Sequence, residues 1–101
     1  MIDTKKVQGI INLVRAADQI ELTPDEGRGY YDYCNDPEGR PDQCVLGING
    51  DYGYYDFTEQ ALSDAWVEGN TILAKPHNSD RAIGITLYRM ERMRVDELLK
   101  G

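Results

Sequence analysis

The feature that most constrains the fold of this chain is a four-residue sequence that occurs twice. Gly-Tyr-Tyr-Asp occurs at residues 29–32 and again at 53–56, and an aromatic residue follows each copy. Aromatic residues favour strands, in which alternate side chains share a face. We therefore predict that both copies of this tyrosine repeat are strands of one sheet. The buried face would carry Tyr31, Tyr33, Tyr55 and Phe57, and the face turned to water would carry Tyr30, Asp32, Tyr54 and Asp56.

A turn signal lies directly before the second copy. Asn49-Gly50 separates two β-prone segments, and Asn-Gly is the strongest short signal for a two-residue hairpin because both residues tolerate positive φ. The pattern predicts a three-stranded meander over residues 30–34, 44–48 and 51–57.

Helices are predicted on either side of the meander. Apolar residues recur with helical spacing between residues 3 and 18, where Asp3 or Thr4 can cap the first turn. Thr58 can cap a second helix over 58–68, ended by Gly69. Beyond it we expect a second hairpin, formed by 70–76 and 81–91, and a short helical turn at 95–100.

These elements predict an α+β fold with a single domain over residues 1–101. We expect an antiparallel sheet of about five strands with the two helices packed on one face. The expected core consists of Ile10, Ile11, Val14, Leu62, Trp66, Ile83, Ile85 and Leu87.

The charge of the chain is unevenly distributed. The net charge is −7, and residues 18–68 carry thirteen acidic residues against Arg28 and Arg40 alone. Such a field repels nucleic acid and favours basic partners. The sequence shows neither a signal peptide nor an apolar run long enough for a membrane helix. We therefore expect a cytoplasmic protein with reduced cysteines and no membrane partner.

No arrangement of residues indicates catalysis, and we predict that the protein is not an enzyme. Cys34, Cys44 and His77 lack the spacing of a zinc site, and no nucleophile and base stand in a recognisable motif. We predict no metal and no cofactor. The two cysteines would be small structural side chains, and their pairing is left open.

The tyrosine content suggests a binding surface. The chain has seven tyrosines and one phenylalanine, and tyrosine is enriched in the hot spots of protein interfaces. Interleaved carboxylates would suit a basic partner and could occupy sites that normally hold phosphates, as a DNA mimic does. The simple packing of a half-buried sheet is the alternative. The predicted partner-binding residues are Tyr30, Asp32, Asp36, Glu38, Asp42, Asp51, Tyr52, Tyr54 and Asp56.

Residues 34–47, Cys-Asn-Asp-Pro-Glu-Gly-Arg-Pro-Asp-Gln-Cys-Val-Leu-Gly, resemble a segment of small uncharacterised proteins of actinobacteria and their phages. The small, acidic profile without catalytic motifs is also similar to that of phage anti-defence proteins, including anti-CRISPR proteins. The matched segment implies no activity, and the similarity of profile suggests by analogy a phage-encoded inhibitor that acts in the cytoplasm of the host cell.

Together these observations predict a non-enzymatic inhibitor that occupies the basic, nucleic-acid-binding surface of a host protein, without binding nucleic acid itself. The alternative is a protein that binds or sequesters a small ligand such as a nucleotide, with the aromatic face stacked on the base. The oligomeric state is left open, a homodimer included.

Overall fold

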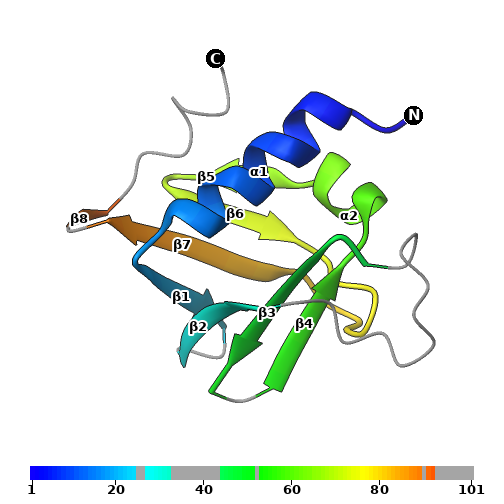
Figure 1. Cartoon of the computed structure of the whole chain (residues 1–101). Coiled ribbons are helices and arrows are strands. Elements are labelled where there is room, and N and C mark those ends of the chain that lie inside the picture. The colour runs from blue at the N-terminus through cyan, green and yellow to red at the C-terminus, as the bar shows by residue number, and fades with distance from the viewer. Residues whose placement is uncertain (25–26, 33–43, 52, 90, 93–101) are drawn as a thin grey trace.

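The structure, a computed structural model, describes residues 1–24, 27–32, 44–51, 53–89 and 91–92. In this part of the chain two helices and eight strands follow one another (Figure 1). Their bounds are α1 (Thr4–Ala16), β1 (Gln19–Thr23), β2 (Gly27–Asp32), β3 (Leu46–Gly50), β4 (Gly53–Phe57), α2 (Glu59–Ser63), β5 (Trp66–Glu68), β6 (Thr71–Ala74), β7 (Ile83–Arg89) and β8 (Glu91–Arg92). The mixed α+β fold is confirmed.

The strands form one antiparallel sheet with the order β4-β3-β2-β1-β7-β6-β5, and the two-residue β8 pairs with β7. Two meanders, β1 to β4 and β5 to β7, meet where β1 pairs with β7. The expected number of about five strands is therefore wrong, because the main path alone has seven. Strand β1 was not predicted, because the composition of residues 23–29 is typical of a loop and residues 19–22 had no assigned element.

The sheet has to curl because its two end strands are joined by a short segment. Seven strands laid flat at ~4.8 Å spacing would separate β4 from β5 by roughly 29 Å. Residues 58–65, which make that connection and include α2, reach only about 20 Å. Figure 1 shows the resulting curved sheet, with both helices on the same side of it as predicted.

Helix α1 forms where the apolar period predicted it. The Asp3 carboxylate accepts a hydrogen bond from the backbone N–H of Lys6 at 3.1 Å, which caps the first turn. Val7, Ile10 and Val14 lie on one stripe and are buried against the sheet. Ile11, also expected in the core, is only partly buried beside it.

Helix α2 is shorter than predicted. Thr58 caps it as expected, since its hydroxyl accepts from the N–H of Ala61 at 3.0 Å, and Leu62 is fully buried. The helix ends at Ser63, however, and Trp66 begins strand β5 with 47% of its surface exposed. The prediction of Trp66 as a core residue is wrong. Gly69, with φ +63°, lies in the turn between β5 and β6 instead of ending a helix.

The core lies between the helices and the concave face of the sheet. The other predicted core residues, namely Ile10, Val14, Leu62, Ile83, Ile85 and Leu87, are buried at no more than 1% exposure. Phe57, Ile48 and Leu46 join them from β3 and β4. The face of the sheet turned away from the helices is called the outer face below.

The hairpin between β3 and β4 is confirmed, but its turn is not at Asn49-Gly50. Both residues belong to β3, and Gly50 pairs with Gly53, so the chain reverses between these two glycines. Gly50 packs closely against β1: a Cβ there would lie 2.8 Å from Cδ1 of Leu22, so a larger residue would require that side chain to shift. The hairpin of β6 and β7 is confirmed as predicted. The helical turn expected at 95–100 lies outside the described residues.

Candidate binding surface

The two copies of the tyrosine repeat lie in register across the sheet. Strand β3 pairs with β2 on one side and β4 on the other, so β2 and β4 run in the same direction. Asn49 is opposite both Tyr30 and Tyr54, and the same register sets residues 31 and 55, and residues 32 and 56, at equivalent positions. Equivalent residues of the two copies are therefore two strand spacings apart, about 9–10 Å. Tyr30, Asn49 and Tyr54 are called the tyrosine row below.

The faces of the second copy follow the predicted alternation, except at Asp56. Phe57 is fully buried and Tyr55 packs against the core, whereas Tyr54 is 47% exposed on the outer face. A half-exposed tyrosine on a paired strand offers rigid apolar area with a polar tip. Tyr54 is thus the best-defined contact residue among the described members of the predicted site.

Asp51 is exposed at the β3–β4 turn and is tied to the neighbouring strand. Its Oδ2 accepts from the backbone N–H of Arg28 at 3.1 Å, and its own N–H donates to the carbonyl of Arg28 at 3.2 Å. The second oxygen, Oδ1, leaves acceptor capacity on the carboxylate. Asp51 therefore fixes the hairpin end and presents a negative charge beside it.

Asp56, predicted to face water, is buried at 2% exposure. The imidazole Nε2 of His77 lies 3.8 Å from its Oδ2. The β6–β7 loop, residues 75–82, packs over this carboxylate and brings the imidazole beside it. Asp56 is therefore a part of the packing between β4 and this loop and cannot serve as a surface contact.

The same loop covers the outer edge of β4. The N–H of His77 donates to the Asp56 carbonyl at 2.9 Å. The Asn78 side chain bonds twice: its Oδ1 accepts from the Asp56 N–H at 3.0 Å, and its Nδ2 donates to the Tyr54 carbonyl at 2.9 Å. The loop thus satisfies edge groups that would otherwise be open to another strand.

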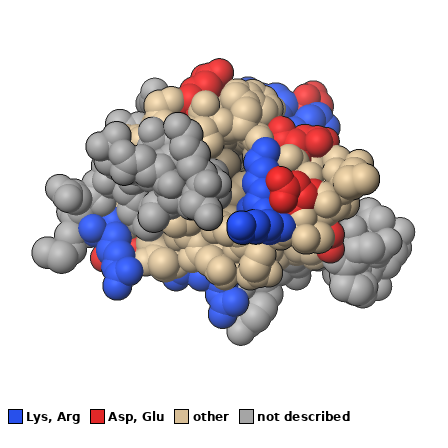
Figure 2. Space-filling model, turned by 90° about the horizontal axis from the view of Figure 1, so that it is seen from above, with Lys and Arg blue, Asp and Glu red and all other residues tan. Residues whose placement is uncertain are grey.

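The remaining predicted contact residues have no described side chains. Tyr30 and Asp32 are placed by the backbone register alone. Asp36, Glu38, Asp42 and Tyr52 lie outside the described residues. The face seen from above in Figure 2 carries acidic and basic side chains next to one another, so its described part has no single sign of charge.

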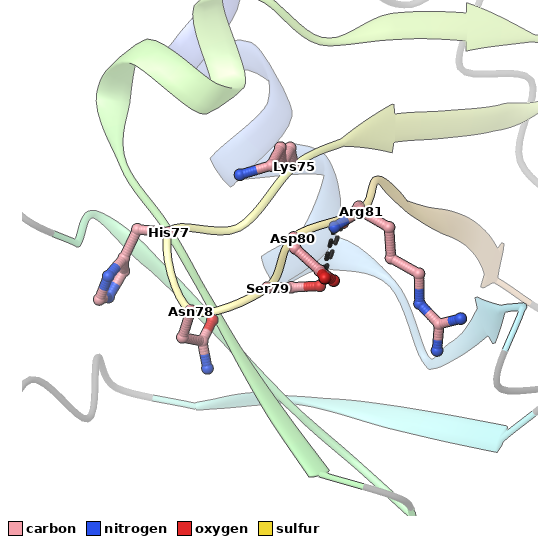
Figure 3. A pocket seen from close by; sticks show the side chains of 6 residues that line it. All are labelled: Lys75, His77, Asn78, Ser79, Asp80 and Arg81. Atoms are coloured by element: carbon pink, nitrogen blue, oxygen red, sulfur yellow. Dashed lines mark hydrogen bonds between the residues drawn. The ribbon is translucent and has the colours of Figure 1, made fainter.

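A shallow, open depression lies on the β6–β7 loop. It is lined by Lys75, His77, Asn78, Ser79, Asp80 and Arg81. In Figure 3 the side chains of His77 and Arg81 point to opposite sides of the loop. The Ser79 hydroxyl is engaged within the loop, because it accepts from the N–H of Arg81 and lies 3.2 Å from the Arg81 carbonyl. These groups do not converge on one ligand position.

Trp66 is the exposed residue that sequence reasoning missed. Its indole N–H donates to Oε1 of Glu68 at 3.2 Å, and both side chains are exposed on β5. The alternation Trp66, Val67, Glu68, with only Val67 packed on the core, is a strand signal of period two. The helix was predicted to extend to residue 68 because this short alternation follows directly on the helical spacing of Ala61, Leu62 and Ala65.

Cys44 is buried and disulfide-bonded, so the expectation of reduced cysteines is wrong for it. The other cysteine of the sequence, Cys34, lies outside the described residues. Disulfides are typical of oxidising compartments, which weighs against the expected cytoplasmic location. Among the described residues, no three potential metal ligands of the His, Cys, Asp or Glu type come together.

Comparison of the chain with protein-family models, with curated proteins and with solved structures finds no match. Neither described helix has the length and apolar character needed to cross a membrane.

Proposed function

We propose that this chain is a non-enzymatic binding protein that docks on a basic surface of another protein. The observation that carries the proposal is the in-register tyrosine row, with Tyr54 exposed on it and the Asp51 carboxylate at the hairpin end. The aromatic side chain of Tyr54 supplies contact area at a low entropic cost, because the paired strand already holds the residue.

The acidic middle of the chain sets the sign of the partner. Residues 18–68 contain thirteen acidic residues and two arginines, which speeds the encounter with a positive surface and disfavours negative ones. The nucleic-acid-binding surface of a host protein is the partner that we propose, and a phage-encoded inhibitor is the biological role. With Asp56 buried, the described contact residues of this proposal are Tyr54 and Asp51.

The experiment is capture of a binding partner followed by measurement with the purified pair. The immobilised chain is exposed to bacterial lysate at low and high salt, the retained protein is identified, and its affinity is measured by calorimetry. We expect the retained protein to be one that binds duplex DNA, and we expect the chain to displace that DNA from it. The Tyr54→Ser variant should weaken the complex at least tenfold, the loss typical of a tyrosine hot spot.

Tyr88→Ser is the matched control, because Tyr88 is a partly buried tyrosine on β7, outside both the tyrosine row and strand β5. Asp51→Asn keeps an acceptor for the Arg28 N–H and removes only the charge, so it should lower the association rate and reduce the salt dependence. Equal losses in Tyr54→Ser and Tyr88→Ser would contradict the proposed face. A co-purifying nucleotide in place of a protein would favour the small-ligand alternative.

A further inference from the structure

Strand β5 carries an aromatic ring held beside a carboxylate. Trp66 and Glu68 are two residues apart on the same face of the strand, and both are exposed. The hydrogen bond from the indole N–H to Glu68 Oε1, at 3.2 Å, restrains the ring next to the negative charge. The carboxylate keeps acceptor positions, since one N–H uses only one of about four lone-pair sites.

The neighbouring strand completes a small patch on the outer face. Leu73 of β6 is directly opposite Trp66, and Thr71 is directly opposite Glu68. Leu73 and Thr71 are both half-buried. The patch therefore has an apolar end, made by the indole and Leu73, and a polar end, made by Glu68 and Thr71.

We propose that this β5 patch binds an arginine side chain of a basic partner protein. The guanidinium plane would stack on the indole, which is the best aromatic partner for a cation. Its N–H donors would reach the Glu68 carboxylate, and its aliphatic stem would lie along Leu73. Lysine fits less well, because its ammonium group is a point charge without the planar donor fork.

Both this inference and the proposed function assume a positively charged partner, but they depend on different residues. The β5 patch and the tyrosine row lie on different strands, at opposite ends of the sheet order. Either surface can therefore be inactivated without changing the other, and the two proposals can fail separately.

The test uses the indole itself as the reporter, because Trp66 is the only tryptophan of the chain. The full chain is titrated with the peptide acetyl-Gly-Arg-Gly-Arg-Gly-amide, and the tryptophan fluorescence and the indole N–H resonance are followed. The control peptide contains citrulline at both arginine positions, which keeps the shape and removes the charge. We expect a saturable change with the arginine peptide and binding at least threefold weaker with the citrulline peptide, the scale of a weak charge contact.

Two charge variants locate the contact. Glu68→Gln keeps an acceptor for the indole N–H and removes the charge, and it should weaken binding of the arginine peptide about threefold. Glu59→Gln removes the same formal charge from an exposed position on α2, and it should leave the affinity for the arginine peptide unchanged. Equal affinities of Glu68→Gln and Glu59→Gln, or equal binding of both peptides, would overturn the inference.

Tyr54→Ser separates this inference from the proposed function. It should leave the peptide titration unchanged, because Tyr54 lies on β4 and not on β5. If Tyr54→Ser weakens the arginine peptide and Glu68→Gln does not, the arginine binds at the tyrosine row. That result would overturn the β5 patch while leaving the proposed function intact.

Discussion

Strands β4 and β5, at the two ends of the sheet, each carry one large aromatic residue that is 47% exposed, Tyr54 and Trp66. The outer edges of the two strands differ in their hydrogen bonding. At the β4 end, the backbone beneath Tyr54 is bonded to the β6–β7 loop through His77 and Asn78. At the β5 end, no described strand or loop residue forms a hydrogen bond with the outer edge of the strand. The β5 strand is only three residues long, and short edge strands are themselves a protection against unwanted pairing.

The difference shows what each aromatic residue can do. Tyr54 stands on a strand whose edge is closed, so a partner can meet only the side chains of its outer face. Trp66 stands on a short strand where a local carboxylate, and not the packing of a loop, fixes its ring. The first arrangement suits a rigid contact surface, and the second suits a single side chain of a partner.

The largest expected difference between the two ends lies in the residues that anchor them in the core. Phe57 of β4 is fully buried, whereas Val67 of β5 is half-buried. Phe57→Ala should lower the free energy of unfolding by about 3–5 kcal/mol, because it leaves a cavity. Val67→Ala should cost about 1 kcal/mol, because it removes less apolar area. Urea unfolding measures both, and similar costs would contradict the stronger anchoring of β4.

The next prediction breaks the closure of β4 itself. Asn78→Ala removes both side-chain hydrogen bonds and leaves the Asp56 N–H and the Tyr54 carbonyl without their partners. The expected cost is about 1–3 kcal/mol. The control is Asn12→Ala on the exposed side of α1, where only a bond with Gln8 is lost and the change should stay within about 0.5 kcal/mol. Indistinguishable urea midpoints for the two variants would show that the loop does not stabilise β4.

The smallest expected effect concerns Trp66 on strand β5. Trp66→Ser should change the free energy of unfolding by about 1 kcal/mol or less, since the ring is 47% exposed and substitutions at such positions are mild. A core tryptophan, as the sequence reading assumed, would cost roughly 3–5 kcal/mol on truncation. Thermal unfolding of the variant decides between these values, and a loss in the upper range would place Trp66 in the core after all.

The sequence predicted the parts of the fold that depend on local pattern. The apolar stripe and the Asp3 cap defined α1, and the period-two alternation around Ile85 defined β7. The shared sheet of the two tyrosine repeats followed from their composition. These features are encoded within a few residues of one another, so periodicity and capping are sufficient to find them.

The errors arose where distant segments decide the outcome. Asp56 has a solvent-facing position in the strand alternation, but the loop around His77 covers it from 21 residues further along the chain. Asn49-Gly50 has the composition of a turn, yet Gly50 pairs with Gly53, so both residues of the dipeptide belong to strand β3. Tyr54 and Asp51 are exposed as expected, whereas Asp56 is buried, because burial by another element leaves no local signal.

Amide hydrogen exchange at Asp56 tests the closed edge of β4 most directly. In the native protein its N–H donates to Oδ1 of Asn78 at 3.0 Å, so we predict slow exchange in the native chain and clearly faster exchange in Asn78→Ala. The amide of Ile48, on the central strand of the tyrosine row, should stay protected in both. Rapid exchange of Asp56 in the native chain, or a rate unaffected by Asn78→Ala, would contradict the closure of the edge on which Tyr54 stands.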